Sequence, residues 1–205
     1  MTCIVGYVEQ NVSWIVGDSA ACDATDNTMR VRQDPKVFRN GSMIIGYSGS
    51  FRVGQVMRYE LKLPSRPNGM EPFEYMVTRF VSTLKKCVEK HGISKEMEET
   101  QALVGYAGQL FCIESDLQVA MNNNHFEAIG MGRLLAIGSM HTTSKLKIET
   151  QKRLLLAITS ASEFSHTVSP PFLLGWLKSP RSYGFLISKD GKKWTDYVSP
   201  WPIIQ

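Results

Sequence analysis

The stretch MTCIVGYVEQNVSWIVGDS, residues 1–19, decides how the whole chain is interpreted. Thr2–Val8 and Val12–Gly17 are rich in β-forming residues, and the short polar turn Glu9-Gln10-Asn11 separates them, so the sequence predicts an antiparallel hairpin. Thr2 stands at the head of the first strand. If Met1 is removed, which a small second residue normally permits, Thr2 carries a free α-amine beside its hydroxyl.

An N-terminal threonine can hold a nucleophile and its base in one residue, because the α-amine takes the proton of the hydroxyl. A free α-amine has an ordinary pKa of about 7.7 to 8.0, so a substantial fraction is neutral and basic at physiological pH. No histidine is needed nearby. Thr2 is therefore the candidate nucleophile, and the alternative is that it is merely the second residue of an ordinary chain.

The composition is that of a globular protein: 205 residues, 43% of them hydrophobic and 20% charged. We expect a single domain over residues 1–205. The sequence contains no apolar run of about 18 residues and no basic start followed by an apolar core, so we expect a cytoplasmic protein without a membrane partner. A net charge of +4, spread along the chain, does not indicate nucleic acid. The four cysteines lack metal-binding spacing, and no metal or cofactor is predicted.

Further along the chain, Lys36–Arg39 and Ser42–Gly46 flank Asn40-Gly41, a favoured two-residue turn, and so predict a second hairpin. Apolar residues at helical spacing predict helices over Phe51–Leu61 and Phe73–His91. The other predicted elements are strands at Ala102–Tyr106, Leu110–Ile113 and Gln118–Met121, a helix at Ile148–Phe164, and a hairpin of Tyr183–Ser188 with Lys192–Tyr197. Strands and helices form separate runs, which favours an α+β fold over a parallel sheet.

Five short motifs in order resemble the proteasome β-subunit superfamily of N-terminal nucleophile hydrolases, in particular the bacterial HslV-type ring protease. They are Met1-Thr2, Ile15–Ser19, Lys36-Val37, Ile45–Gly49 and Ala136–Ser139. The resemblance covers roughly the first 60 residues and again residues 134–168, and it leaves a divergent segment from about residue 170. It implies a four-layer αββα sandwich.

The resemblance also implies a role for each matching residue. Thr2 would be the nucleophile, and Asp18 would orient Thr2 and the lysine. Lys36 would lie beside Thr2, where its positive charge lowers the proton affinity of the hydroxyl and the amine. Gly46 would donate a backbone N–H to the oxyanion, and Ser139 would hydrogen-bond near the α-amine. Taken singly, the aspartate, the glycine and the serine are equally compatible with turn or cap positions.

The resemblance further implies that Ala21, Cys22, Phe38 and Ile45 line the substrate channel, and these residue types predict a pocket for a nonpolar side chain before the scissile bond. The segment between Ser139 and Glu163 is several residues shorter than in the family. One outer helix is therefore expected to be trimmed.

As a function, the resemblance implies a threonine peptidase that cleaves unfolded polypeptides and assembles into a homo-oligomeric ring. A separate ATPase unfoldase is a possible partner, because the chain has no ATPase motif of its own. Two alternatives stay open: a non-catalytic structural subunit that retains Met1, and an N-terminal nucleophile amidohydrolase that acts on a small amide. Because only Met1 precedes Thr2 in this sequence, no propeptide is expected, which favours the peptidase.

Overall fold

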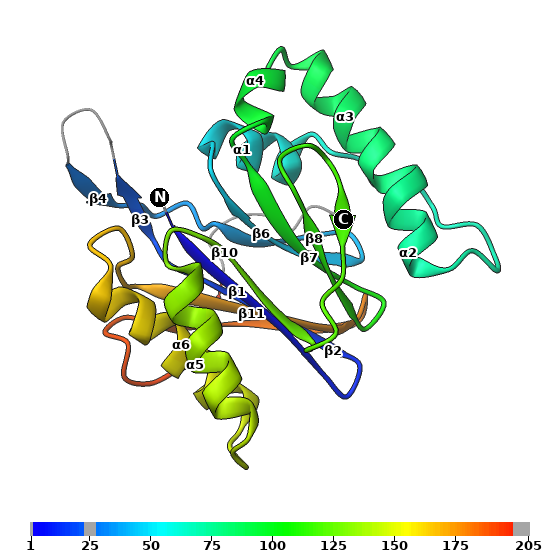
Figure 1. The fold of residues 1–205 in the computed structure, drawn as a ribbon. Coiled ribbons are helices and arrows are strands. Elements are labelled where there is room, and N and C mark those ends of the chain that lie inside the picture. The colour runs from blue at the N-terminus through cyan, green and yellow to red at the C-terminus, as the bar shows by residue number, and fades with distance from the viewer. Residues whose placement is uncertain (1, 23–27, 199–205) are drawn as a thin grey trace.

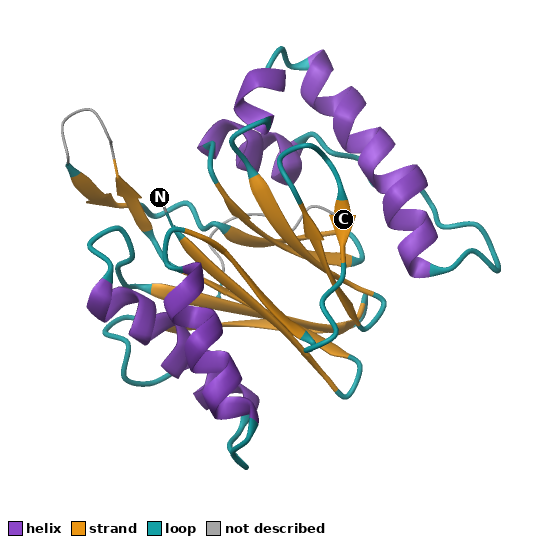
Figure 2. Ribbon diagram, viewed as in Figure 1, coloured by secondary structure: helices purple, strands orange, loops and turns teal. Residues whose placement is uncertain are grey.

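The computed structural model describes residues 2–22 and 28–198. Two β-sheets lie face to face, and helices cover the outer face of each, as Figure 1 and Figure 2 show. This arrangement confirms the predicted α+β class and the four-layer αββα sandwich. Within the described residues, no helix has the length and apolar character needed to span a membrane.

The first sheet contains both strands of the N-terminal hairpin at its centre. Its order is β10 (Phe126–Gly130), β1 (Cys3–Glu9), β2 (Val12–Gly17), β11 (Phe172–Ser179), β12 (Ser182–Ser188) and β13 (Thr195–Asp196). All neighbouring pairs are antiparallel. The predicted β1–β2 hairpin is confirmed, and Gln10 and Asn11 form its turn with φ values of 51° and 61°.

The second sheet contains the strands that follow along the chain. Its order is β5 (Val37–Asn40), β6 (Met43–Ser48), β7 (Gln101–Tyr106), β8 (Gln109–Ile113) and β9 (Val119–Ala120). A separate ribbon pairs β3 (Ala20–Cys22) with β4 (Met29–Val31). Asn40 pairs with Met43, so the turn residues are Gly41 and Ser42 and the predicted Asn40-Gly41 turn is wrong by one residue. Asn40 instead donates from its side chain to the carbonyls of Met57 and Leu61.

Two helices cover the first sheet, and a second group covers the other. The first pair is α5 (Arg133–Ser144) and α6 (Thr150–Phe164). The second group is α1 (Phe51–Tyr59), α2 (Pro72–Tyr75), a π-helical turn at Met76–Phe80, α3 (Val81–Lys90) and α4 (Ser94–Met97). The segment 72–90 is the helix predicted for Phe73–His91, and Gly92 ends it with φ +65°.

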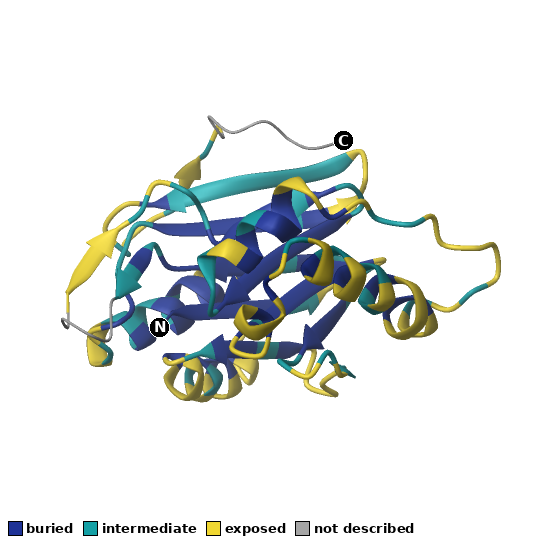
Figure 3. Ribbon diagram, turned by 90° about the horizontal axis from the view of Figure 1, so that it is seen from above, coloured by how far each residue is buried: buried dark blue, intermediate teal, exposed yellow. Residues whose placement is uncertain are grey.

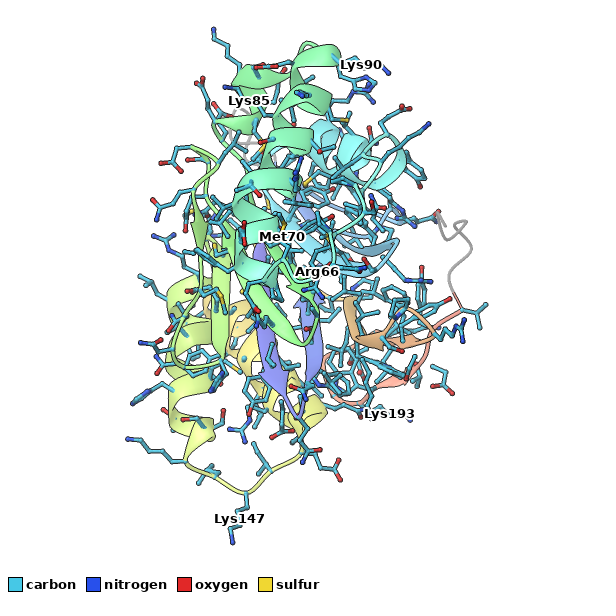
Figure 4. The ribbon with its side chains drawn as sticks, turned by 90° about the vertical axis from the view of Figure 1, so that its right-hand side faces the viewer. Arg66, Met70, Lys85, Lys90, Lys147 and Lys193 are labelled. Carbon is cyan, nitrogen blue, oxygen red and sulfur yellow. The ribbon has the colours of Figure 1, made fainter. Side chains whose placement is uncertain are left out.

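Apolar residues fill the three spaces between the layers, and Figure 3 shows the buried inner strands beneath outward-facing exposed helix residues. Alternate residues of β1 face opposite ways: Cys3 and Val5 pack against α5 and α6, whereas Ile4 packs between the two sheets. By the same alternation the side chain of Thr2 faces the space between the sheets. The labelled lysines in Figure 4 are all exposed and lie on α3, on the α5–α6 connection and on the β12–β13 connection.

Candidate active site

Thr2 lies immediately before β1 and is almost completely buried, with 2% of its surface exposed. Its hydroxyl donates a hydrogen bond to Oδ1 of Asp18 at 3.1 Å. The same hydroxyl accepts a short hydrogen bond from the Lys36 ammonium. Three residues far apart in the sequence therefore meet at one oxygen atom.

Asp18 connects this cluster to the backbone at the end of β2. Its Oδ1 accepts from the backbone N–H of Cys3 at 3.0 Å and from Lys36 Nζ at 2.9 Å. Its Oδ2 accepts from the backbone N–H of Ala20 at 2.9 Å. Together with the Thr2 hydroxyl, these donors satisfy a buried carboxylate whose position is fixed by the two strands that it joins.

Lys36 enters the cluster from the start of β5 in the opposite sheet. Its side chain is 2% exposed, and its charge is compensated by the ion pair with Asp18. Burial lowers the pKa of the Lys36 ammonium below its ordinary value, and the carboxylate of Asp18 opposes this shift. The ammonium therefore places a positive charge against the Thr2 hydroxyl while releasing its proton more easily than a surface lysine.

The connection from β10 to α5 forms the wall behind Thr2. The backbone N–H of Gly132 donates to the carbonyl of Thr2 at 3.2 Å. A methyl group on Gly130, which has φ +88°, would lie 2.4 Å from that carbonyl oxygen and 2.8 Å from Oγ of Ser48. Only a glycine fits at position 130, because the carbonyl of Thr2 lies on one side of it and Ser48, at the end of β6, lies on the other.

Gly130→Ala should therefore displace Thr2 and reduce the stability of the fold. The backbone strain and the contact with the Thr2 carbonyl together cost on the order of 2–4 kcal/mol. Gly69→Ala is the matched control, because Gly69 has a similar φ of +79° with no heavy atom within 4 Å of the added methyl. Thermal unfolding measures both variants; equal losses of stability at the two positions would contradict the contact at Gly130.

Ser139 does not occupy the place that the sequence predicts for it. It lies within α5, seven residues beyond Gly132, which corresponds to roughly 10 Å along a helix axis. Its backbone carbonyl accepts from Thr143, as in an ordinary helix turn. The predicted role of Ser139 near the α-amine is wrong, and the residues that contact Thr2 from this part of the chain are Gly130 and Gly132.

The position of Ser139 within α5 also changes the expectation for the outer layer of helices. Ser139 belongs to α5, so the residues between the end of β10 and the end of α6 are sufficient for two helices of 12 and 15 residues. The predicted trimming of one helix is therefore wrong. The trimming is expected only when the motif at residues 136–139 is aligned with the family, whereas the segment beside Thr2 begins eight residues earlier, at residue 128.

Gly46 is also not free to bind an oxyanion. It lies inside β6, opposite Val37 on one side and Leu103 on the other. The N–H of Tyr47 donates to the carbonyl of Lys36 towards β5, so the alternation of an antiparallel strand turns the N–H of Gly46 towards β7. A methyl group here would lie 2.6 Å from Ile4, and Gly46 thus permits close packing of the two sheets.

The four predicted substrate-channel residues separate into two groups. Ala21 and Cys22 are half-buried on β3, the strand that follows Asp18, so their predicted role stays open. Phe38 and Ile45 are 2% and 0% exposed and pack in the core between the second sheet and its helices. Because that core lies behind the sheet, the prediction that they line the channel is wrong.

Among residues 2–22 and 28–198, no three His, Cys, Asp or Glu side chains gather in a way that could hold a metal ion. The polar groups at the site are those around Thr2, together with Ser48 and the Gly49 bend, which belong to the motif Ile45–Gly49 but have no predicted role of their own. A signal for the bend was present, since Ser48-Gly49-Ser50 leads directly into α1, and Ser50 caps that helix by accepting from Val53.

No protein-family model matches the chain, and no curated protein matches it. Several solved structures match the chain in fold. BPH from Thiobacillus denitrificans is 16% identical with a TM-score of 0.70, over 86% of this chain and 97% of BPH. The eukaryotic HslV of Trypanosoma brucei is 17% identical with a TM-score of 0.62, over 86% of this chain and 99% of HslV. Anbu from Yersinia bercovieri is 11% identical with a TM-score of 0.65, over 90% of this chain and 86% of Anbu.

These similarities show that the chain has the fold of HslV and other proteasome-like proteins. They confirm, at the level of fold, the resemblance predicted from the sequence motifs.

Proposed function

We propose that this chain, with the fold of HslV and the proteasome-like proteins, is a threonine peptidase whose nucleophile is Thr2. The observation that carries the proposal is the buried cluster in which the Thr2 hydroxyl contacts both the Lys36 ammonium and the Asp18 carboxylate. Met1 lies outside the described residues. The proposal requires its removal, so that the α-amine of Thr2 becomes free.

In the proposed reaction, the α-amine takes the hydroxyl proton as Thr2 Oγ1 attacks the carbonyl carbon of a peptide bond. Lys36 favours the alkoxide through its positive charge, and Asp18 holds Lys36 and Thr2 in place. The amine then gives the proton to the leaving nitrogen, which leaves an acyl-enzyme ester on Thr2. Water hydrolyses that ester and regenerates the threonine.

The developing oxyanion needs a backbone donor other than Gly46. We assign the role of this donor to a backbone N–H in the bend at the end of β6, where Gly49 adopts φ +116° and the strand pattern ends. Ser48 next to it already lies against Gly130, on the Thr2 side of the sheet. An N–H in a bend lies outside the ladder of strand hydrogen bonds, whereas an N–H inside a strand is bonded to the neighbouring strand. We propose that an N–H of this bend stabilises the oxyanion.

The test is hydrolysis of fluorogenic peptides by the purified protein, combined with sequencing of its N-terminus. We expect a chain that begins at Thr2 and releases the fluorophore. A chain that retains Met1 and cleaves no peptide would favour a structural subunit instead. Hydrolysis of small amides without any hydrolysis of peptides would favour an amidohydrolase.

We further propose that the protein assembles into a cytoplasmic homo-oligomeric ring that cleaves unfolded polypeptides. A separate ATPase unfoldase is a possible partner. Exposed apolar side chains near the adjacent start of α5 and end of α6 support a subunit contact: Met131, Leu134 and Phe164 are 62%, 73% and 77% exposed. Sedimentation velocity at micromolar concentration should show a species several times larger than the 23.0 kDa chain. A single 23.0 kDa species would contradict the ring.

A further inference from the structure

A cavity of about 370 Å³ lies between the segment that leads into β5 and the exposed side of α1. Its polar and aromatic lining comes from Arg32, Asp34, Tyr47, Gln55, Arg58 and Tyr59. The sequence analysis assigned none of these residues a function. The cavity therefore differs in position and in character from the apolar channel expected from Phe38 and Ile45.

The cavity adjoins the Thr2 cluster through the ring of Phe51. Lys36 Nζ, which contacts the Thr2 hydroxyl, lies 5.8 Å from the centre of that ring. The guanidinium of Arg32 lies 4.1 Å from the same ring centre, and the ring of Tyr47 lies 6.2 Å from it. Arg32 and Tyr47 both line the cavity, so the ring of Phe51 contacts residues of the cavity wall and also lies near Lys36 of the Thr2 cluster.

The charges in the cavity do not balance. Arg32 and Asp34 form a two-pronged ion pair with distances of 2.7 and 2.5 Å, so each compensates the other. Arg58 is 8% exposed, yet within the described part of the chain it makes no ion pair. Among the described residues, its guanidinium lies 5.2 Å from the ring centre of Tyr59 and 5.7 Å from that of Phe38, and the charge of Asp34 acts on it through space without forming an ion pair.

Partial removal from water disfavours the charged guanidinium of Arg58 and lowers its pKa, and the charge of Asp34 opposes this shift. A carboxylate that entered the cavity would offset this cost and would form charge-assisted hydrogen bonds with Arg58. A neutral side chain would leave the charge uncompensated, and a basic one would add a like charge.

We propose that this cavity selects peptides with an acidic side chain, glutamate or aspartate, immediately before the scissile bond, and that Arg58 is the residue that recognises the carboxylate. The inference rests on the proposed peptidase function, since it assigns that activity a substrate class. It replaces the nonpolar preference expected from the sequence.

The experiment compares four fluorogenic peptides that differ only in the residue before the scissile bond: Glu, Gln, Leu or Lys. For the unmodified protein, kcat/KM should be at least about tenfold higher for Glu than for its neutral isostere Gln, and lowest for Lys. A preference for Leu, or equal rates for Glu and Gln, would overturn the inference. This comparison uses only the unmodified protein, so its outcome does not depend on whether a variant folds.

Three variants on α1 then test Arg58 itself. Arg58→Gln should reduce the preference for Glu over Gln to within about threefold, because the charge that recognises the carboxylate is gone. Arg58→Lys keeps the charge and should retain part of the preference. Arg52→Gln is the matched control, since Arg52 is exposed on the same helix, and it should leave the preference unchanged. An unchanged preference in Arg58→Gln would overturn the role of Arg58.

Labelling with epoxomicin separates the two proposals. Epoxomicin is the compound with which BPH from Thiobacillus denitrificans was solved in complex. If Thr2 is labelled and peptides are cleaved without a preference for acidic residues, the peptidase function is supported and the proposed selection of acidic side chains is contradicted. If no peptide is cleaved and Thr2 is not labelled, the peptidase function itself falls, and the pocket's role with it.

Discussion

Replacing Thr2 by alanine should abolish peptide hydrolysis and leave the protein folded. The substitution removes Oγ1, the atom that Lys36 and Asp18 both contact. Loss of a nucleophile leaves only binding and oxyanion stabilisation, so kcat/KM should fall by at least about 1,000-fold. Fluorogenic peptide hydrolysis measures this loss directly.

Stability separates a catalytic role of Thr2 from a structural one. Asp18 keeps its bonds from Cys3, Ala20 and Lys36 in the Thr2→Ala variant, so unfolding should become easier by only about 1–2 kcal/mol. Thr2→Ser, which keeps the hydroxyl, should retain activity to within about tenfold. Full activity in Thr2→Ala, or equal inactivity in both variants, would show that the hydroxyl is not the nucleophile.

Breaking the buried pair of Asp18 and Lys36 should have the largest effect on stability. Asp18→Ala leaves the Lys36 ammonium buried, at 2% side-chain exposure, without its carboxylate. Removing one partner of such a pair costs about 3–5 kcal/mol, which lowers Tm by roughly 6–20 °C in a chain of this size. Activity should be lost as well, because Thr2 and Lys36 lose the group that orients them.

The double variant Asp18→Ala with Lys36→Met gives the control. It removes both charges together, so its loss of stability should be smaller than the sum of the two single losses by at least about 1 kcal/mol. Its activity should stay absent, since the charge beside the hydroxyl is gone. Additive losses of stability would mean that the two groups are not coupled, contrary to the 2.9 Å ion pair.

The parts of the fold that the sequence predicts well are those with strong local signals. The first hairpin combines β-forming runs with a short polar turn, and its strands appear as β1 and β2. The helix over residues 72–90 follows from a continuous apolar stripe. The positions of Asp18 and Lys36 beside Thr2 are expected from the family resemblance and not from a local signal, because the contacts between the two sheets depend on tertiary packing.

The second hairpin shows how a local turn signal can be overridden. Asn40-Gly41 favours a two-residue turn, yet Asn40 pairs within the strand and Gly41 begins the turn with φ +52°. The side-chain amide of Asn40 binds two carbonyls at the end of α1, at 2.9 and 2.8 Å. Burying those carbonyls without a donor would be costly, so the tertiary contact sets the register.

The error over Ser139 has a simple origin, because Ala-Ile-Gly occurs twice, at residues 128–130 and 136–138. The first copy ends β10 beside Thr2, and the second lies inside α5. Exposed Leu134 and Leu135 give α5 an apolar run that resembles a strand. The copy at residues 136–138 is followed by a serine, whereas the copy at the site is followed by Met131, so the sequence pattern favours the wrong element.

The most direct test of Thr2 as an N-terminal nucleophile is the intact mass of the protein after reaction with epoxomicin, with the adduct located by fragmentation. We expect a chain that lacks Met1 and carries one inhibitor on Thr2; the Thr2→Ala variant should carry none. A chain that retains Met1, or an adduct on any other residue, would contradict the account.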